Sequence, residues 1–263
     1  MSVMTRIIAI TNQKGGVGKT TTGVNLAASL AATHRRVLLV DLDPQGNATM
    51  GSGIDKRELS ATVYHVLLGE KRVADVRLRA AHAGYDVLPS NRELAGAEVE
   101  LVDIDHRETR LKHALQEVAA DYDFILIDCP PALNLLTLNG LTAAQAVLIP
   151  MQCEYYALEG LTDLVGTIKR VRAHLNPDLK IEGLLRTMYD PRNTLAQQVS
   201  AQLLQHFGNK VYRTVIPRNV RLAEAPSHGL PALEFDRASK GAQAYLALAG
   251  EILNRAAKNN VSN

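Results

Sequence analysis

Short apolar runs recur along the chain, and most are followed by a longer segment with apolar residues at helical spacing. A short, continuous apolar run is typical of a strand that is buried on both faces of a parallel sheet. This pattern predicts strands at 6–10, 36–41, 85–89, 123–128, 146–150, 180–188 and 210–216. It predicts helices at 22–32, 92–120, 138–145, 158–175, 195–207 and 240–257, short helices within 62–82 and a loop at 51–61.

The alternation of expected strands and helices favours an α/β fold, doubly wound, with a mostly parallel sheet and helices on both faces. No internal repeat, low-complexity tract or Pro/Gly/Ser-rich linker divides the sequence, so we expect a single domain over residues 1–263. No uninterrupted apolar run approaches the ~20 residues of a membrane-spanning helix. The first residues also lack the apolar core of a signal peptide.

Composition limits the classes of partner. Aromatic residues make up only 4% of the chain and tryptophan is absent, which argues against a stacking platform for single-stranded nucleic acid. Lys and Arg number 29 against 27 Asp and Glu, so a surface that binds duplex DNA must be a local cluster. Cys129 and Cys153 have no metal-ligand or disulfide spacing, which fits a reducing cytosol.

The most informative stretch is residues 12–21, Asn-Gln-Lys-Gly-Gly-Val-Gly-Lys-Thr-Thr, between the first expected strand and the first expected helix. This is the context of a phosphate-binding P-loop, in which glycines let backbone N–H groups turn towards phosphate oxygens. Lys19 is expected to reach the β- and γ-phosphates, and the Thr20 hydroxyl to bind Mg²⁺. The expected nucleotide-binding residues of the loop are Lys14, Gly15, Gly16, Val17, Gly18, Lys19, Thr20 and Thr21.

The loop departs from the usual P-loop pattern at its start. Gln13 occupies the position where the usual pattern has glycine, and a second lysine, Lys14, follows it. The sequence Lys-Gly-Gly-x-Gly-Lys-Thr resembles the deviant Walker A loop of the ParA/MinD/NifH ATPases. The resemblance implies a P-loop NTPase, Rossmann-like fold with ATP and Mg²⁺ as cofactors. It also implies that Lys14 reaches across the interface of an ATP-bound homodimer to the partner's nucleotide.

Three aspartates end expected strands, at the sheet edge where α/β proteins bind ligands. Asp128 resembles a Walker B aspartate, which holds Mg²⁺ through water. The segment Asp41-Leu-Asp43-Pro-Gln-Gly resembles the switch I motif of the ParA family. The resemblance implies that Asp43 positions the attacking water and that Asp41 lies near the Mg²⁺ hydration shell. The expected metal site is therefore Thr20, Asp41, Asp43 and Asp128, and the expected catalytic residues are Lys14, Lys19 and Asp43.

The resemblance covers nearly the whole chain. Segments 128–131, 154–160, 187–190 and 215–227 are similar to the chromosomal branch of the family, ParA or Soj. In that branch the positions of Met188, Pro217 and Asn219 contact the adenine. Arg186 is a departure, because an apolar residue is more usual there, and it either adds a basic side chain or caps a strand edge. Cys129 lies near the cluster cysteine position of the nitrogenase iron protein, but one cysteine without a matched second does not indicate a cluster.

This resemblance implies a chromosome- or plasmid-partitioning ATPase that is cytoplasmic and nucleoid-associated. Its ATP-bound sandwich dimer would bind double-stranded DNA without sequence preference, and a ParB-like centromere-binding protein would stimulate an otherwise slow hydrolysis. The expected DNA-binding residues are Arg218 and Arg221, with Arg213 and Lys240 behind them. The run Lys169, Arg170 and Arg172 is either a further DNA surface or a solvated charged face.

Two alternatives remain open. A MinD-like membrane-cycling ATPase would need an amphipathic C-terminal helix with bulky apolar residues. Residues 252–263 have a weak apolar face and no aromatic residue, so we expect no stable membrane association. A positioning ATPase for another cargo fits the sequence equally well. Because the first expected strand begins near the start of the sequence, we expect no helix-turn-helix domain before it.

Overall fold

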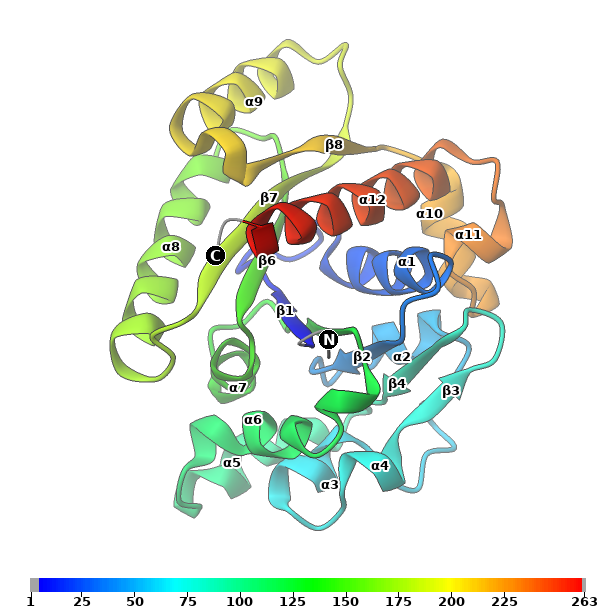
Figure 1. Cartoon of the computed structure of the whole chain (residues 1–263), viewed down its shortest axis with the longest axis vertical. Coiled ribbons are helices and arrows are strands. Elements are labelled where there is room, and N and C mark those ends of the chain that lie inside the picture. Colours follow the sequence, from blue (N-terminus) through cyan, green and yellow to red (C-terminus); the bar gives the residue numbers. More distant parts are fainter. Residues whose placement is uncertain (1–4, 262–263) are drawn as a thin grey trace.

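One sheet runs through the middle of the molecule, with helices packed on both of its faces (Figure 1). The computed structural model describes residues 5–261, with side chains up to residue 257. The strands are β1 (Arg6–Ile10), β2 (Val37–Asp41), β3 (Leu78–Ala80), β4 (Tyr85–Leu88), β5 (Phe124–Asp128), β6 (Ala146–Gln152), β7 (Lys180–Tyr189) and β8 (Val211–Pro217). Their order is β3-β4-β2-β5-β1-β6-β7-β8. All pairs are parallel except β3 with β4, which confirms the expected doubly wound, mostly parallel fold.

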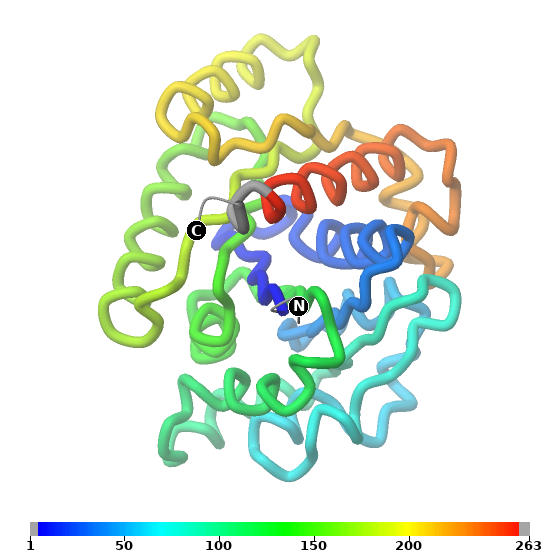
Figure 2. Tube along the Cα trace, in the orientation of Figure 1, coloured from blue at the N-terminus to red at the C-terminus, as the bar shows by residue number. Residues whose placement is uncertain are grey.

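The helices up to α9 lie between successive parallel strands, and α10, α11 and α12 follow the last strand, as the course of the chain shows (Figure 2). They are α1 (Lys19–Ala31), α2 (Asn47–Gly51), α3 (Val63–Leu68), α4 (Val73–Val76), α5 (Leu94–Glu100), α6 (Arg110–Gln116), α7 (Leu135–Ala143), α8 (Ala157–His174), α9 (Thr194–Phe207), α10 (Val220–Glu224), α11 (Ala232–Phe235) and α12 (Lys240–Val261). Among the described residues, none of these helices is long and apolar enough to cross a membrane.

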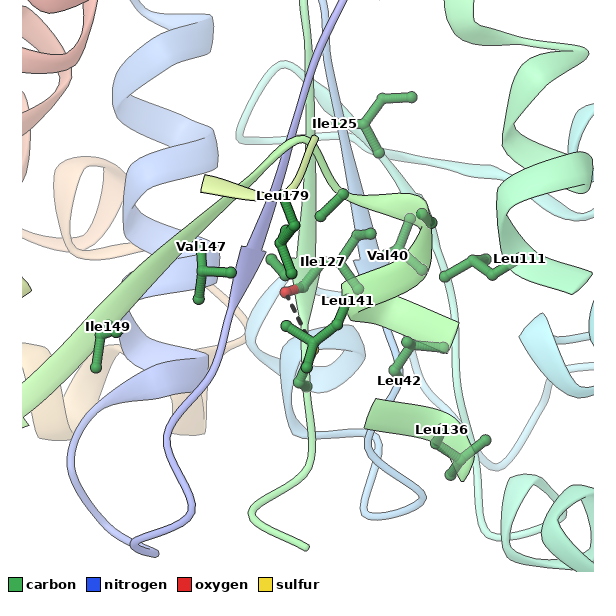
Figure 3. Close-up of a cluster of buried hydrophobic side chains, with 14 of the residues drawn as sticks. Val40, Leu42, Leu111, Ile125, Ile127, Leu136, Leu141, Val147, Ile149 and Leu179 are labelled. Atoms are coloured by element: carbon green, nitrogen blue, oxygen red, sulfur yellow. Dashed lines mark hydrogen bonds between the residues drawn. The ribbon is translucent and has the colours of Figure 1, made fainter. Parts of the chain in front are cut away.

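Alternate residues of the central strands enter two separate apolar cores. Ile8 and Ile10 of β1 pack with α1 and α12, whereas Ala9 belongs to the core on the opposite face. Figure 3 shows part of that second core, where Ile125 and Ile127 of β5 lie among residues of α6 and α7. Because side chains alternate across a strand, a run of consecutive apolar residues is what a sheet covered on both faces requires.

Two sequence predictions were wrong in detail. The expected helix over 92–120 is broken: α5 ends in a 3₁₀ turn at Leu101–Asp103, and His106 adopts a left-handed conformation with φ 57° before α6 begins. The apolar spacing continues across this break, so periodicity alone did not reveal it. The antiparallel strand β3 lies where only short helices were expected, because its three residues, Leu-Arg-Ala, are too few to show a strand pattern.

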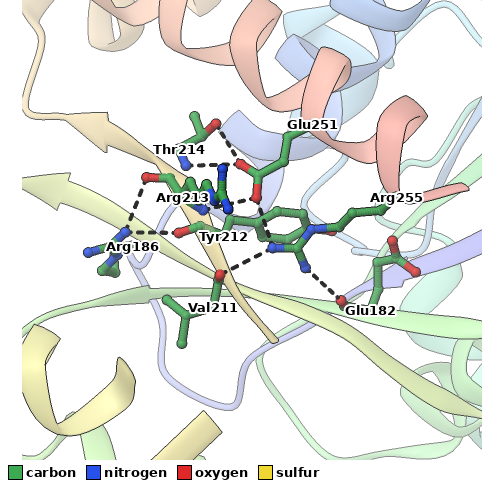
Figure 4. A network of polar contacts seen from close by, with 8 residues as sticks. All are labelled: Glu182, Arg186, Val211, Tyr212, Arg213, Thr214, Glu251 and Arg255. Atoms are coloured by element: carbon green, nitrogen blue, oxygen red, sulfur yellow. Dashed lines mark hydrogen bonds and ion pairs between the residues drawn. The ribbon is translucent and has the colours of Figure 1, made fainter. Parts of the chain in front are cut away.

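The outer edge of β8 is covered by side chains of α12 (Figure 4). The N–H groups of Arg213 and Thr214 each donate to the Glu251 carboxylate at 2.9 Å. Arg255 donates to the carbonyl of Val211 at 3.1 Å and to Glu251 at 2.8 Å. These contacts occupy backbone groups that an edge strand would otherwise offer to another chain, so they protect the sheet from aberrant pairing.

Arg186 of β7 contacts β8 from the opposite side, where the two strands pair (Figure 4). Its guanidinium is only 8% exposed and donates to the Ser200 hydroxyl and the Tyr212 carbonyl, both at 2.8 Å. Of the two interpretations of Arg186, the structure supports the structural one, because the side chain ties β7 to β8 and α9. It offers no basic surface.

Candidate nucleotide site

The candidate site lies at the carboxyl end of the central strands. Pairing aligns Ile10 of β1 with Asp128 of β5, and Asp128 with Asp41 of β2. The loop of residues 11–18 follows β1 directly and leads into α1. Asp128 therefore lies beside the end of the strand that leads into the glycine-rich loop, and Asp41 lies one strand further along the same edge.

The loop presents a series of backbone donors. Gly16 and Gly18 have positive φ angles of 73° and 87°, which bend the chain in a way that other residues rarely adopt. The N–H groups of residues 15–21 have no hydrogen-bond acceptor within the described part of the chain. Successive free N–H groups at the start of a helix form an anion-binding nest, so this segment can bind phosphate.

Two side chains hold the loop against neighbouring strands. The Asn12 amide donates to the Pro150 carbonyl of β6 at 2.8 Å and accepts from the N–H of Lys14 at 3.0 Å. On the other side, the Thr187 hydroxyl of β7 donates to the Val17 carbonyl at 2.8 Å. These bonds satisfy backbone groups that point away from the nest, so the remaining N–H groups stay available to a ligand.

The two lysines of the loop have different surroundings. Lys19 is 7% exposed, and its ammonium donates to the Lys14 carbonyl at 3.2 Å, inside the loop. Burial lowers the pKa of Lys19, while the carboxylates of Asp128 and Asp43 oppose this change. Lys14 instead points outwards and pairs with Glu154 at 2.5 Å, both side chains being about half exposed. Lys14 therefore does not contribute to the phosphate nest of its own chain.

Gln13 has a structural use that explains its departure from the usual loop. Its amide donates to the Thr167 hydroxyl of α8 at 3.4 Å, which a glycine could not do. The contact links the start of the loop to the helix that follows β6.

The surroundings of Asp128 fit a bound Mg²⁺. Its carboxylate is fully buried, and within the described residues neither oxygen has a hydrogen-bond partner of normal geometry. Burial raises the pKa of Asp128 well above its usual range, the Asp41 carboxyl adds to the rise, and the nearby Thr20 hydroxyl opposes it. A cation beside Asp128 and Thr20 would compensate the buried charge. One carboxylate and one hydroxyl suit Mg²⁺, which keeps several waters.

Asp41 is already engaged by the loop that follows it. Its oxygens accept from the N–H and hydroxyl of Thr49, both at 2.8 Å, and from the N–H of Asp43 at 3.1 Å. Thr49 in turn accepts from the N–H of Ser90, whose hydroxyl donates to the Asp43 carbonyl. Burial raises the pKa of Asp41 to about 6 despite these bonds. These hydrogen bonds show that Asp41 orients the loop that carries Asp43.

The expected base-contacting residues meet at the ends of β7 and β8. Tyr189 pairs with Pro217, which places Met188 beside the strand that leads to Asn219. Met188 has a φ of 48°, a strained conformation for a residue other than glycine. The Asn219 Oδ1 is buried without a hydrogen-bond partner in the described structure. Because a Cβ added at Gly241 of α12 would lie 3.1 Å from this oxygen, the amide would have to turn before it could accept from the exocyclic amine of adenine.

Three of the four expected DNA-binding residues lie close together. Gly241, which follows Lys240 at the start of α12, packs against Leu222 of α10. Lys240 therefore lies beside the helix that carries Arg221 and that Arg218 precedes. All three basic side chains belong to exposed residues.

Two of the candidates are less favourable than the sequence indicated. Arg221 forms ion pairs with Glu224 at 2.8 Å and Asp236 at 3.2 Å, so its charge is partly compensated. Arg213 contacts α12 through Glu251, about 16 Å along the helix axis from Lys240 at 1.5 Å per residue. It therefore lies apart from the other three. The basic run of α8 lies on the side of the molecule opposite α10 (Figure 1).

Cys129 has a packing use. It is 1% exposed, and a Cβ added at Gly140 of α7 would lie 2.8 Å from its sulfur. The small residue pair lets α7 approach the sheet closely. Burial also raises the pKa of the Cys129 thiol, so it is a poor nucleophile or metal ligand at neutral pH.

Sequence reasoning missed Thr187, Thr49 and Glu154, which hold the loop, the Asp43 segment and Lys14. Thr187 and Glu154 act on residues far away along the chain, and no local motif indicates any of the three contacts. The one available signal was the position of Thr187 immediately before Met188.

A glycine-rich phosphate loop after the first strand, a buried aspartate on the neighbouring strand and a parallel sheet covered by helices define a P-loop nucleoside triphosphatase. Comparison with known proteins narrows this class. The AAA domain family matches residues 5–181. Soj of Bacillus subtilis, a sporulation initiation inhibitor protein, is 57% identical over 95% of this chain and 98% of its own. The chromosome partitioning protein ParA of Caulobacter vibrioides NA1000 is 53% identical over 95% and 94%.

A solved structure gives the same picture. Cobyrinic acid a,c-diamide synthase from Mycobacterium smegmatis, with bound ADP and magnesium, has a TM-score of 0.84 and 43% identity. The match covers 95% of this chain and 94% of that one. The chain belongs to the ParA/Soj family of ATPases, whose cofactors are ATP and Mg²⁺.

Proposed function

We propose that the protein is a DNA-segregation ATPase. Two copies associate around two ATP molecules, and the dimer binds duplex DNA without sequence preference. Hydrolysis, stimulated by a ParB-like centromere-binding protein, separates the copies and releases the DNA. The observation that carries this proposal is the outward position of Lys14, on a loop that already holds its own phosphate-binding lysine, Lys19.

Lys14 is suited to act on a second nucleotide. Its only ion-pair partner in the described structure, Glu154, is about half exposed, as Lys14 is. An exposed ion pair contributes roughly 0–1 kcal/mol, so an ATP phosphate presented by another copy can displace Glu154 at little cost. Lys14 then neutralises charge on the partner's nucleotide, and assembly of the dimer depends on ATP.

Hydrolysis depends on groups that each chain supplies for itself. The N–H groups of residues 15–21 and Lys19 bind the phosphates, and Thr20 with Asp128 would hold Mg²⁺, which offsets phosphate charge. Asp43 is half-buried at the start of its loop, where its carboxylate orients the attacking water for in-line displacement. Asp41 acts through Asp43, whose N–H it binds. Intrinsic turnover is slow, because the DNA-bound state must outlast the search for the stimulating partner.

DNA binding uses the surface formed by Arg218, Arg221 and Lys240. All three belong to exposed residues near α10, adjacent to the base pocket at Asn219. Contacts with phosphates suffice for binding without sequence preference. Each side chain appears twice in a dimer, so ATP-dependent dimerisation doubles the number of phosphate contacts. The protein is accordingly cytoplasmic and associated with the nucleoid.

A membrane-cycling function is less well supported. In the described part of α12, the apolar residues Tyr245, Leu248 and Ile252 are at most 1% exposed and belong to the core with α1. That face of the helix is therefore already occupied. A lipid-binding role would require it to leave the protein interior.

The proposal is tested by measuring binding to two unrelated duplexes with ATP, with ADP and without nucleotide. We expect equal affinity for both duplexes with ATP and negligible binding otherwise. If the dimer neutralises about four phosphates, log K falls with log salt at a slope of roughly −3.6, so a fourfold rise in salt weakens binding on the order of a hundredfold. Strong preference for one sequence, or binding that ignores the nucleotide, would contradict the proposal. Sedimentation with vesicles in parallel tests the membrane alternative.

A further inference from the structure

β7 contains a bulge where it passes the nucleotide site. Arg186 pairs with Val215 and Tyr189 pairs with Pro217, so three steps along β7 match two along β8. The extra residue falls in the Thr187–Met188 segment, where Met188 takes its left-handed φ of 48°. A bulge of this kind redirects side chains and is often found next to functional sites. The Thr187–Met188 segment contains no glycine, the residue that most readily adopts a positive φ.

The bulge places two functions on consecutive residues. Thr187 is 2% exposed, and its hydroxyl donates to the Val17 carbonyl of the phosphate loop at 2.8 Å. Its side chain also packs against Gly18, where an added Cβ would lie 3.8 Å from the Thr187 Cβ. Met188 follows at the base pocket and accepts from the Gln152 amide at 2.8 Å. The segment therefore joins the phosphate loop to the residues expected to contact the base.

Thr187 is one of two side chains that hold the phosphate loop, and it is the one that joins the loop to β7. Asn12 ties the loop independently to β6 through the Pro150 carbonyl, and the loop continues into α1 on its other side. What the Thr187–Val17 bond fixes is the position of the loop relative to β7. The phosphates and the base of one ADP molecule must reach the phosphate loop and the base pocket at the same time. The distance between these two sites therefore decides whether ADP can occupy both.

We propose that Thr187 is a positioning residue that sets the distance between the phosphate loop and the base pocket, and so couples phosphate binding to base recognition. The proposal rests on the base pocket formed by Met188, Pro217 and Asn219. Loss of the Thr187 hydroxyl leaves the nest able to bind phosphate. It lowers the additional affinity that contacts with the base give to ADP over pyrophosphate.

The test compares Mg²⁺–ADP with Mg²⁺–pyrophosphate, each measured in competition with a fluorescent ADP. Thr187→Val keeps the shape of the side chain and removes the hydroxyl. We expect the ADP affinity to fall about tenfold, the effect of one buried hydrogen bond, while pyrophosphate affinity stays within about twofold. Thr187→Ser restores ADP affinity. Thr33→Val removes a similar bond, from the Thr33 hydroxyl to the Leu30 carbonyl at the far end of α1, and serves as the matched control.

A double-mutant cycle separates coupling from loosening of the loop. Asn219→Ala should also lower the affinity for ADP but not that for pyrophosphate. The Thr187→Val/Asn219→Ala protein should bind ADP little more weakly than whichever single variant has the lower ADP affinity. Additive losses, or a pyrophosphate affinity that falls as far as that of ADP, would show that Thr187 only supports the phosphate loop and would overturn the proposal. If Asn219→Ala leaves the ADP affinity unchanged, Asn219 does not contribute to base binding and the proposal is overturned as well. That result would not bear on the proposed DNA binding, which the assay with duplex DNA tests separately.

Discussion

Replacement of Lys14 by alanine is the most direct perturbation of the proposed dimer. Among the described residues, the Lys14 ammonium pairs only with Glu154, and both side chains are about half exposed, at 47% and 49%. Such a pair contributes roughly 0–1 kcal/mol, so Lys14→Ala should leave the stability of the monomer nearly unchanged. Because Lys14 lies outside the nest of its own chain, the affinity for ADP should also stay within a few-fold.

The dimer should respond very differently. A hydrogen bond to a charged group is worth about 1.5–3 kcal/mol, and symmetry removes two of them, one from each copy. The loss of about 3–6 kcal/mol raises the dimer dissociation constant by roughly two to four orders of magnitude. Light scattering or sedimentation with Mg²⁺–ATP measures this change. The measurement is best made with proteins that also carry Asp43→Ala, so that hydrolysis does not consume the ATP.

Lys71→Ala is a suitable control, because Lys71 is exposed and lies between α3 and α4, away from the nucleotide site. A Lys14→Ala protein that dimerises with ATP as well as this control does would refute the assignment of Lys14. A protein that has lost ADP binding as well would show instead that Lys14 acts within its own chain.

Other changes test separate parts of the structure. Asp43→Ala should reduce ATP hydrolysis by orders of magnitude while ATP affinity stays within a few-fold, as measured by phosphate release and nucleotide titration. Arg218→Glu should weaken DNA binding of the ATP dimer at least tenfold in a gel-shift assay, and more than Arg221→Glu, because two carboxylates already compensate Arg221. Gly140→Ala should cost about 1–3 kcal/mol in chemical denaturation, since its Cβ would overlap the sulfur that packs there. Burial alone would raise the pKa of Glu251, but hydrogen bonds from Thr214, Arg213 and Arg255 lower it below 4.5, so this stabilisation is present at neutral pH and lost as pH falls below 4.5. Glu251→Gln should therefore narrow the difference in melting temperature between pH 7 and pH 4.

The parts of the site that were predictable from sequence are those built from consecutive residues. A phosphate nest consists of neighbouring backbone N–H groups, so the glycines, Lys19 and Thr20 had to appear in one stretch. The strand-end aspartates were likewise predictable, because parallel strands bring their carboxyl ends to one edge. The same local logic predicted the central strands closely, since burial on both faces leaves a continuous apolar run.

Elements whose sequences carry no such pattern were not predictable. The strand β3 is mostly exposed, and α10 and α11 span only Val220–Glu224 and Ala232–Phe235. Helices this short are determined by their packing, because nucleation is unfavourable without tertiary contacts. Arg186 illustrates the same limit in one residue. Its charge favoured the surface, but its three hydrogen bonds to Ser200, Tyr212 and Arg213 would not have been inferred without knowing that β8 lies beside it.

The same division separates nucleotide binding from the coupling that a cycling ATPase needs. Binding requires groups that are adjacent along the chain, whereas coupling requires contacts between segments that move relative to one another. We expect three contacts among the described residues to serve this coupling: Lys14 with Glu154, Asp41 with Thr49, and Val17 with Thr187. Each joins the nucleotide-binding segments to another part of the chain. Variants at Glu154, Thr49 or Thr187 should therefore change dimerisation, hydrolysis or base recognition while the affinity for phosphate alone persists.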